Sequence, residues 1–193
     1  MTRVGVLALQ GDFAEHRQML QRLGAEVVEV RLPVHLQGVD GLIIPGGEST
    51  TIRRLMDLYD LADLVVQRAQ QGMPVWGTCA GAIILARQLT DDRPQPLGLL
   101  DMVVTRNAFG RQVDSFEEEI LIPVLGPERF HAVFIRAPIV ERVGPEVEVL
   151  AQLPDGRIVA IQQKRLLATS FHPELTSDTR FHAHFLKLME AAS

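Results

Sequence analysis

Residues Pro74–Leu85 read Pro-Val-Trp-Gly-Thr-Cys-Ala-Gly-Ala-Ile-Ile-Leu, and this stretch predicts the centre of the fold. Its apolar beginning is typical of a short buried strand, and its end is typical of an apolar helix. Cys79, the only cysteine in the chain, lies between them, with Gly77 two positions before it and Gly81 two positions after it. This is the Gly-x-nucleophile-x-Gly pattern of a nucleophile elbow, with sulfur in place of a serine oxygen.

The two glycines have a steric role in such an elbow. A strand that turns abruptly into a helix brings backbone close to backbone, where a Cβ atom would clash. The N–H groups at the start of the following helix point at the side chain of Cys79 and favour its thiolate, the nucleophilic form. A lone cysteine in an apolar run is more often a small core residue. The flanking glycines and the strand–turn–helix context favour the catalytic interpretation.

Length and composition set the limits for the rest of the chain. With 193 residues, 47% of them hydrophobic, we expect a single globular domain spanning residues 1–193. The net charge of −5 without a basic patch predicts no nucleic-acid partner. A single cysteine excludes an intramolecular disulfide and is typical of a reducing compartment. The chain has no signal-peptide pattern and no apolar run of about 20 residues, so we expect a cytoplasmic protein with no membrane association.

The first half of the chain alternates strand-like and helix-like segments, the pattern of an α/β fold with a parallel sheet. Apolar runs predict strands over Val4–Leu9, Glu26–Leu32, Gly41–Ile44 and Met73–Trp76. Asp12 suits a helix cap, and the helix after it has His16 on its apolar face, where we expect a half-buried structural side chain. Further helices are expected over 52–57, 61–71 and 83–89.

The second half changes character, because strand-like segments follow one another without an obvious helix between them. This pattern predicts an antiparallel extension beside the parallel sheet. The chain then ends in a helix over 177–192, which buries an aromatic and aliphatic face and on which we expect His182 and His184 to be structural. The strand-like segments are 102–105, 119–122, 132–135, 147–151, 157–162 and 166–170.

Three other segments, one with adjacent glycines and two with arginines, are candidates for binding. Pro45–Thr51 (Pro-Gly-Gly-Glu-Ser-Thr-Thr) follows the third predicted strand, where adjacent glycines let backbone N–H groups approach a ligand closely. Arg106–Gln112 and Phe134–Pro138 contribute arginines, whose guanidinium groups suit a substrate carboxylate. Taken singly, the adjacent glycines are weak evidence against a plain strand-to-helix loop, and each arginine is more often part of a surface ion pair.

Ser170–Leu175 reads Ser-Phe-His-Pro-Glu-Leu and supplies the groups that a thiol nucleophile needs. The proline between His172 and Glu174 fixes the local backbone, so that both side chains can take a set orientation. An imidazole can accept the thiol proton, and a neighbouring carboxylate can orient the ring and stabilise the imidazolium. The pair predicts a Cys-His-Glu triad, provided that the fold brings His172 to Cys79.

The elbow, the Pro-Gly-Gly loop and the late His-Pro-Glu together resemble the class I (triad) glutamine amidotransferases. Leu9-Gln10-Gly11, the Glu-Ser-Thr-Thr that follows Gly47, the Arg-Asn-x-Phe-Gly-Arg-Gln loop and Phe-Ile-Arg-Ala-Pro make the chain similar to one branch. That branch contains the glutaminase subunits of pyridoxal 5'-phosphate synthases. The resemblance covers essentially the whole chain.

The resemblance implies a three-layer α/β fold, with a mostly parallel central sheet, helices on both faces and an antiparallel extension. It implies hydrolysis of L-glutamine to glutamate and ammonia, and transfer of the ammonia within a hetero-oligomer to a (β/α)8-barrel synthase subunit that makes pyridoxal 5'-phosphate (vitamin B6). By matched position it implies nucleophile Cys79, general acid/base His172 and orienting Glu174. It also implies an oxyanion hole from Gly47 and Ala80, and glutamine contacts from Gly47, Glu48, Ser49, Arg106, Ile135 and Arg136.

Three alternatives remain open at this point. The chain could be a glutaminase subunit that serves imidazole glycerol phosphate, anthranilate or guanine nucleotide synthesis, with the same chemistry and another acceptor. It could be a DJ-1-like cysteine hydrolase, which shares an elbow but not the late His-Pro-Glu. It could also be a scaffold with a dead site, although an intact triad argues against that. The sequence contains no sign of a metal site or of a bound cofactor.

Overall fold

A computed structural model describes residues 2–106 and 115–190 of the chain. Within these residues the main sheet has ten strands, and two further strands form a separate antiparallel ribbon. In chain order the elements are β1 (Arg3–Leu7), α1 (Phe13–Arg22), β2 (Glu26–Val30), η1 (Pro33–Leu36), β3 (Gly41–Ile44), α2 (Ser49–Leu58), α3 (Ala62–Gln70), β4 (Val75–Thr78), α4 (Ala80–Leu85), β5 (Ala86–Leu89), β6 (Leu100–Thr105), β7 (Ser115–Ile120), η2 (Pro123–Leu125), β8 (Phe130–Ile135), β9 (Ile139–Val143), β10 (Glu148–Gln152), β11 (Ile158–Gln163), β12 (Leu166–Thr169), η3 (Pro173–Leu175) and α5 (Arg180–Glu190).

The main sheet combines a parallel half with an antiparallel half. Its strand order is β2-β1-β3-β4-β12-β11-β9-β6-β5, and β10 pairs with β11 beside this path. The pairs from β2 to β12 are parallel, whereas β11 is antiparallel to β12, β10 and β9. The predicted α/β fold with a mostly parallel sheet and an antiparallel extension is therefore confirmed.

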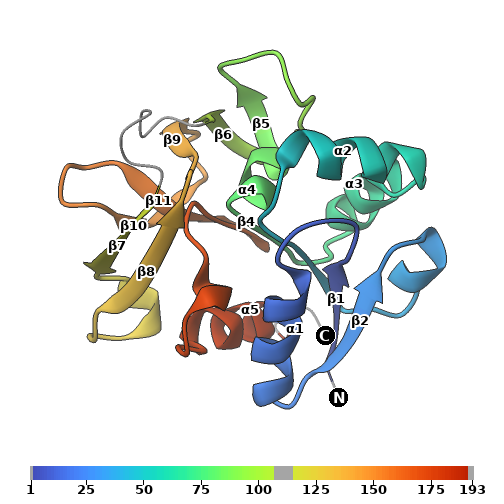
Figure 1. Cartoon of the computed structure of the whole chain (residues 1–193), viewed down its shortest axis with the longest axis horizontal. Helices are drawn as coiled ribbons and strands as arrows, with labels where there is room; N and C mark the ends of the chain where they lie inside the picture. Colours follow the sequence, from blue (N-terminus) through green and yellow to red (C-terminus); the bar gives the residue numbers. More distant parts are fainter. Residues whose placement is uncertain (1, 107–114, 191–193) are drawn as a thin grey trace.

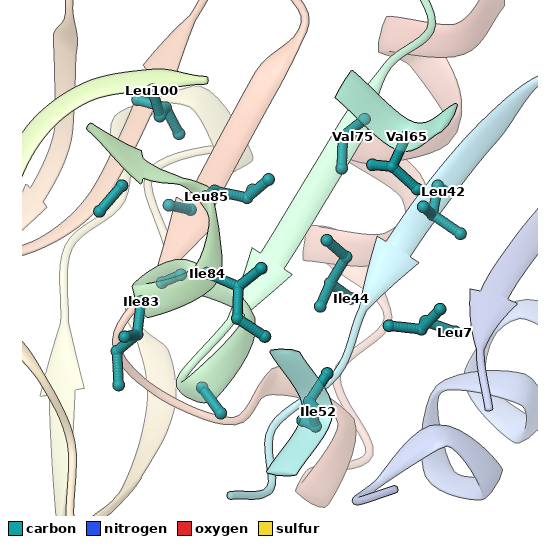
Figure 2. Close-up of a cluster of buried hydrophobic side chains, with 14 of the residues drawn as sticks. Leu7, Leu42, Ile44, Ile52, Val65, Val75, Ile83, Ile84, Leu85 and Leu100 are labelled. Atoms are coloured by element: carbon teal, nitrogen blue, oxygen red, sulfur yellow. The ribbon is translucent and has the colours of Figure 1, made fainter. Parts of the chain in front are cut away.

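Helices cover both faces of the sheet (Figure 1), and buried apolar side chains form one cluster on each face. Along β3, Leu42 and Ile44 belong to the cluster that α2, α3 and α4 cover, whereas Ile43 belongs to the cluster under α1, α5 and the β7–β8 ribbon. This alternation follows from the two-residue period of a strand. Figure 2 shows the first cluster, in which Leu42 lies next to Val65 of α3, and Ile44 lies nearer to Ile52 of α2.

Most of the predicted elements are present, with ends that differ by a few residues. The prediction of a helix over 83–89 is wrong in part: α4 ends at Leu85, and Ala86–Leu89 forms β5, which pairs in parallel with β6. Strand β9 was not predicted, because its exposed Glu141 and Arg142 interrupt the apolar pattern and its place is set by pairing with β6. Of the Arg106–Gln112 loop, only Arg106 lies within the described residues.

None of the helices in the described part of the chain combines the length and the apolar character needed to cross a membrane.

Candidate active site

The predicted elbow is present, and its backbone is strained at the cysteine. Cys79 follows β4 directly, precedes α4, and has φ 48° and ψ −103°. A positive φ is uncommon for a residue with a side chain and is a recurrent feature of functional sites. A Cβ at Gly77 would overlap the backbone of Gly81, and a Cβ at Gly81 would overlap the carbonyl oxygen of Ile44. The glycine spacing therefore reflects the direct contact of backbone with backbone around the turn.

The sheet order brings the two halves of the predicted triad together. β4 lies between β3 and β12, and all three run in parallel, so the segments after their carboxyl ends meet at one edge of the sheet. The backbone N–H of Cys79 donates to the carbonyl of Thr169, the last residue of β12. Three residues later the chain reaches His172, whose N–H donates to the carbonyl of Val133 in β8.

His172 connects the thiol to a buried carboxylate. Its Nδ1 lies 2.8 Å from Oε1 of Glu174, and all three residues of the predicted triad are at most 6% exposed. Burial lowers the pKa of His172, but hydrogen bonds to Asp12, Cys79 and Glu174 outweigh it and raise the pKa to about 12. Burial raises the pKa of Glu174, although the hydrogen bond and the charge of His172 act to lower it. The contact between Nδ1 and Oε1 holds one proton between the two groups. The ring is therefore held where it can exchange a proton with the cysteine.

The Gly46-Gly47 turn lies against the same ring. A Cβ at Gly46 would overlap the His172 imidazole, and a Cβ at Gly47, where φ is 151°, would lie 2.5 Å from Oε1 of Gln10. The Gln10 side chain fixes the turn, because its Oε1 accepts from the N–H of Glu48 at 2.8 Å. Only glycine fits both positions without displacing these side chains.

Glu48 fixes the helix that follows this turn. Its carboxylate accepts from the N–H groups of Thr50 and Thr51, at 3.1 and 2.6 Å, and caps α2. The carboxylate is thus engaged in structure, so we expect any contact between Glu48 and glutamine to come from its backbone. The predicted helix start at Glu48–Thr50 is confirmed.

A cavity of about 380 Å³ opens above the cysteine and collects nearly all of the predicted site residues. The only one that does not line it is Glu174, which lies behind His172. The Arg106 guanidinium reaches the hydroxyls of Ser49 and Thr50, at 3.4 and 3.3 Å, and pairs with Asp91. The cavity is lined by Gln10, Asp12, Gly47, Glu48, Ser49, Cys79, Ala80, Ile83, Arg106, Ile135, Arg136, His172 and Leu175.

Two residues near the start of α1 differ from their predicted roles. Asp12 occupies the N-cap position, but its side chain does not cap the helix; its Oδ2 lies 3.4 Å from Nδ1 of His172. His16 is fully buried rather than half-buried, and its Nε2 lies 3.4 Å from Oε2 of Glu174. No sequence motif marks either residue, because only the tertiary packing of α1 against the His-Pro-Glu turn brings them to the triad.

The donor atoms of Asp12, His172 and Glu174 lie within 4.8 Å of one another, as close as the ligands of a metal ion. His172 and Glu174 already share a hydrogen bond, however, and a metal on Nδ1 would displace it. We therefore assign this cluster to the orientation of the histidine. The arrangement as a whole places a thiol and an imidazole on one cavity, with a carboxylate bonded behind the imidazole, and such a set of groups can perform acyl transfer.

Comparison with known proteins agrees with this geometry. Residues 6–191 match the SNO glutamine amidotransferase family. The chain is 61% identical over 188 residues to the pyridoxal 5'-phosphate synthase subunit PdxT of Herpetosiphon aurantiacus, covering 96% of this chain and 99% of that protein. It is 56% identical over 187 residues to the protein of the same name from a Roseiflexus species, with the same coverage.

Solved structures give the same result. A crystal structure described as a glutamine amidotransferase superposes with a TM-score of 0.92 at 54% identity, covering 97% of this chain and 98% of that one. The structure of PurLQS from Thermotoga maritima, at 16% identity and a TM-score of 0.70 over 96% of this chain and 98% of that one, shares the fold. The family match over nearly the whole chain and the high identity of the relatives establish that the chain belongs to the SNO glutamine amidotransferase family.

Proposed function

We propose that the chain, acting as one domain over residues 1–193, is the glutaminase subunit of a pyridoxal 5'-phosphate synthase. The observation that carries the proposal is the single cavity into which Cys79 and His172 open, with Glu174 bonded behind the histidine. The relatives named pyridoxal 5'-phosphate synthase subunit PdxT support the choice of synthase. The reaction is hydrolysis of L-glutamine to glutamate and ammonia.

Each step of the reaction has a group to perform it. The Cys79 thiolate attacks the side-chain amide carbon of glutamine, and the N–H groups of Gly47 and Ala80 stabilise the oxyanion. His172 protonates the departing nitrogen, so that ammonia leaves and a thioester remains. Water, deprotonated by His172, then attacks the thioester and releases glutamate and the thiolate. Glu174 keeps Nδ1 of His172 protonated, which leaves Nε2 for the transferred proton.

The rest of the cavity suits the amino-acid end of glutamine. Arg106 and Arg136 line it and provide fixed positive charge for the α-carboxylate. Ser49 and the backbone around Glu48 and Ile135 provide polar contacts. Arg136 has φ 43°, a conformation that its side chain disfavours, which is a mark of backbone held in place at a site.

The ammonia goes to a synthase subunit in a hetero-oligomer. We propose a (β/α)8-barrel partner, in line with the family resemblance, and a cytoplasmic complex, because the nucleophile must remain a reduced thiol. No part of the proposal requires a metal or a bound cofactor in this chain; pyridoxal 5'-phosphate is the product of the complex.

The decisive experiment measures glutamate release from L-glutamine by the purified chain, with and without the pyridoxal 5'-phosphate synthase subunit of the same organism. We expect release that depends on Cys79 and formation of pyridoxal 5'-phosphate from sugar phosphates when both subunits are present. Glutamate release without product formation would favour a glutaminase that serves another synthase. Absence of glutamate release under all conditions would exclude the proposed reaction.

A further inference from the structure

Behind the catalytic histidine lies a group of buried polar side chains that the proposed mechanism does not use. His16 of α1 and His182 of α5 are fully buried, and their rings pack edge-on against Trp76 with centroids 5.5 and 4.9 Å away. Nδ1 of His16 lies 2.9 Å from Nε2 of His182. Nε2 of His16 lies 3.1 Å from Oγ1 of Thr78 and 3.4 Å from Oε2 of Glu174.

The protonation of these rings follows from their surroundings. Burial, together with the nearby His182 and His172, lowers the pKa of His16 well below its ordinary value, and burial lowers the pKa of His182 to about 3. Both rings are therefore neutral at physiological pH, and each carries one N–H. Only one proton can occupy the contact between Nδ1 of His16 and Nε2 of His182.

The buried carboxylate decides which ring supplies that proton. Oε2 of Glu174 has no other hydrogen-bond donor within the described residues. If His16 carried its proton on Nδ1, the lone pair of Nε2 would face this oxygen, and a buried charged group would lack a donor at high cost. If His182 donates to Nδ1, the N–H of His16 lies on Nε2 and is shared between Thr78 and Glu174. The second arrangement satisfies the carboxylate.

We propose, on the basis of the glutaminase function proposed above, that His16 is the positioning residue of the triad: fixed as its Nε2–H tautomer by His182, it holds Glu174 ionised and oriented toward His172. Two residues at the start of α1 thus contact the pair, because Asp12 approaches Nδ1 of His172 while His16 approaches Oε2 of Glu174. The groups that face Glu174 are thus His172, His16 and, at longer range, Asp12.

Loss of the His16 N–H should lower the rate of catalysis. Without the N–H of His16, the proton shared by His172 and Glu174 moves toward Glu174, because a buried carboxylate with fewer donors is the stronger base. His172 then has less imidazolium character and stabilises the Cys79 thiolate less. Turnover should fall and thiolate formation should require higher pH, while glutamine binding, which involves none of these groups, should stay the same.

Two substitutions of similar size separate positioning from packing. The amide nitrogen of glutamine reaches the place of imidazole Nε2, whereas that of asparagine reaches only the place of Nδ1. We expect His16→Asn to lower kcat for glutamate release roughly tenfold, the effect of one hydrogen bond to a charged group, with KM unchanged. His16→Gln should restore most of the activity. His184→Asn, in a helix position where the ring bonds to Gln162 instead, is the matched control and should behave as wild type.

A second readout does not depend on glutamine turnover. Cys79 is the only cysteine, so alkylation by iodoacetamide, followed by intact mass, reports its thiolate alone. For His16→Asn, we expect the rise of the alkylation rate with pH to move upward by about one unit, the equivalent of a tenfold change. The profile of His16→Gln should lie close to wild type. If wild type releases no glutamate, the proposed function fails while this readout still tests His16.

The outcomes are distinct. Equal loss in the asparagine and glutamine variants, or wild-type behaviour of both, would overturn the positioning role. If the His16 variants do not fold, nitrogen-15 NMR of the histidines in the wild-type chain decides instead. A neutral Nε2–H tautomer of His16 supports the proposal, and an Nδ1–H tautomer contradicts it.

Discussion

Two glycine turns lie side by side at the active edge of the sheet, after β3 and after β4, and they are held in different ways. In the elbow after β4, the glycines face backbone: Gly77 lies against Gly81, and Gly81 against the carbonyl of Ile44. In the turn after β3, Gly46 and Gly47 face the side chains of His172 and Gln10. The elbow is thus packed against backbone, whereas the second turn is packed against side chains from other elements as well as against the backbone of Gly11 and Asp12.

This difference in packing should give the two turns different conformational freedom. Because the backbone atoms around the elbow are in direct contact with one another, the turn has little room to move, and we expect the position of Cys79 to be constant. A turn that is held partly by contacts with side chains can change its conformation when those side chains move. We therefore expect the proposed nucleophile Cys79 to lie in the more rigid part of the site and the proposed oxyanion donor Gly47 in the more adjustable part. The predictions below test this contrast from the largest expected effect to the smallest.

The largest effect should come from the residue that the elbow presents. Cys79→Ala removes only the sulfur, so we expect glutaminase activity to fall by on the order of 10⁶, the cost of losing a nucleophile in a protease that has been studied in this way. Thermal unfolding should remain close to wild type, because the substituted position keeps its Cβ. Steady-state glutamate release in the presence of the synthase subunit measures the effect. Activity within tenfold of wild type would remove Cys79 from the mechanism.

A methyl group on the elbow should damage the fold rather than the chemistry. In Gly81→Ala the new Cβ would overlap the carbonyl oxygen of Ile44, and Ile44 cannot move away without disturbing its pairing with Gly77 of β4. We expect little or no folded protein, as judged by circular dichroism and by the yield of soluble chain. Gly98→Ala is a control for backbone strain without overlap, because Gly98 has φ 71° but nothing within 4 Å of its added Cβ, so we expect it to fold with a modest loss of stability. A well-folded Gly81→Ala protein would contradict the rigid picture of the elbow.

The sequence predicts the elbow more completely than the surroundings of the second turn, for a physical reason. The elbow could be recognised because its constraint is local, so the spacing of Gly77, Cys79 and Gly81 records it. Strands that are buried on both faces could also be located, since their apolar runs are nearly continuous. The roles of Asp12 and His16 could not, because they arise where α1 packs against η3, over 150 residues away in the chain. Strand β5 was missed for a similar reason: only its pairing with β6 makes Ala86–Leu89 extended.

The same substitution in the other turn should leave a folded but slow enzyme. In Gly47→Ala the new Cβ would meet the end of the Gln10 side chain, and φ would remain at 151°, where alanine is strained. The peptide is expected to rotate away, and losing one oxyanion donor costs about 10²–10³ in rate. Glutamate release and thermal unfolding are measured in parallel. A loss of folding equal to that of Gly81→Ala would abolish the contrast between the turns.

A double substitution sharpens this result. Gln10→Ala in the Gly47→Ala background removes the side chain that the new Cβ meets, while the backbone strain remains. We expect no recovery of activity if the strain displaces the oxyanion donor, and partial recovery if the overlap with Gln10 does. Either result identifies which constraint holds the adjustable turn, whereas at Gly81 no single truncation could relieve the overlap with backbone.

The smallest effect concerns the cap that anchors the adjustable turn to α2. Burial raises the pKa of Glu48, but hydrogen bonds from Thr51 and Thr50 outweigh it and hold the pKa below its ordinary value. A carboxyl whose pKa is depressed by folding stabilises the folded state fully above its unfolded pKa, and this stabilisation is lost as pH falls through the folded pKa. Because Glu48 is solvent-exposed, screening limits the charge contribution, and a lost cap costs about 1 kcal/mol.

We therefore expect Glu48→Gln to lower the thermal midpoint at pH 7 by about 2–4 °C, the usual effect of 1 kcal/mol in a chain of this size. The difference from wild type should shrink as the pH falls from 4.5, the ordinary value for a glutamate, through the lower pKa of the folded chain, because Glu48 then becomes uncharged like the glutamine. Glu146→Gln, which removes a charge from an exposed loop position, should show neither effect. A Glu48→Gln deficit that persists unchanged in acid would mean that the side chain packs the turn rather than caps α2 with its charge.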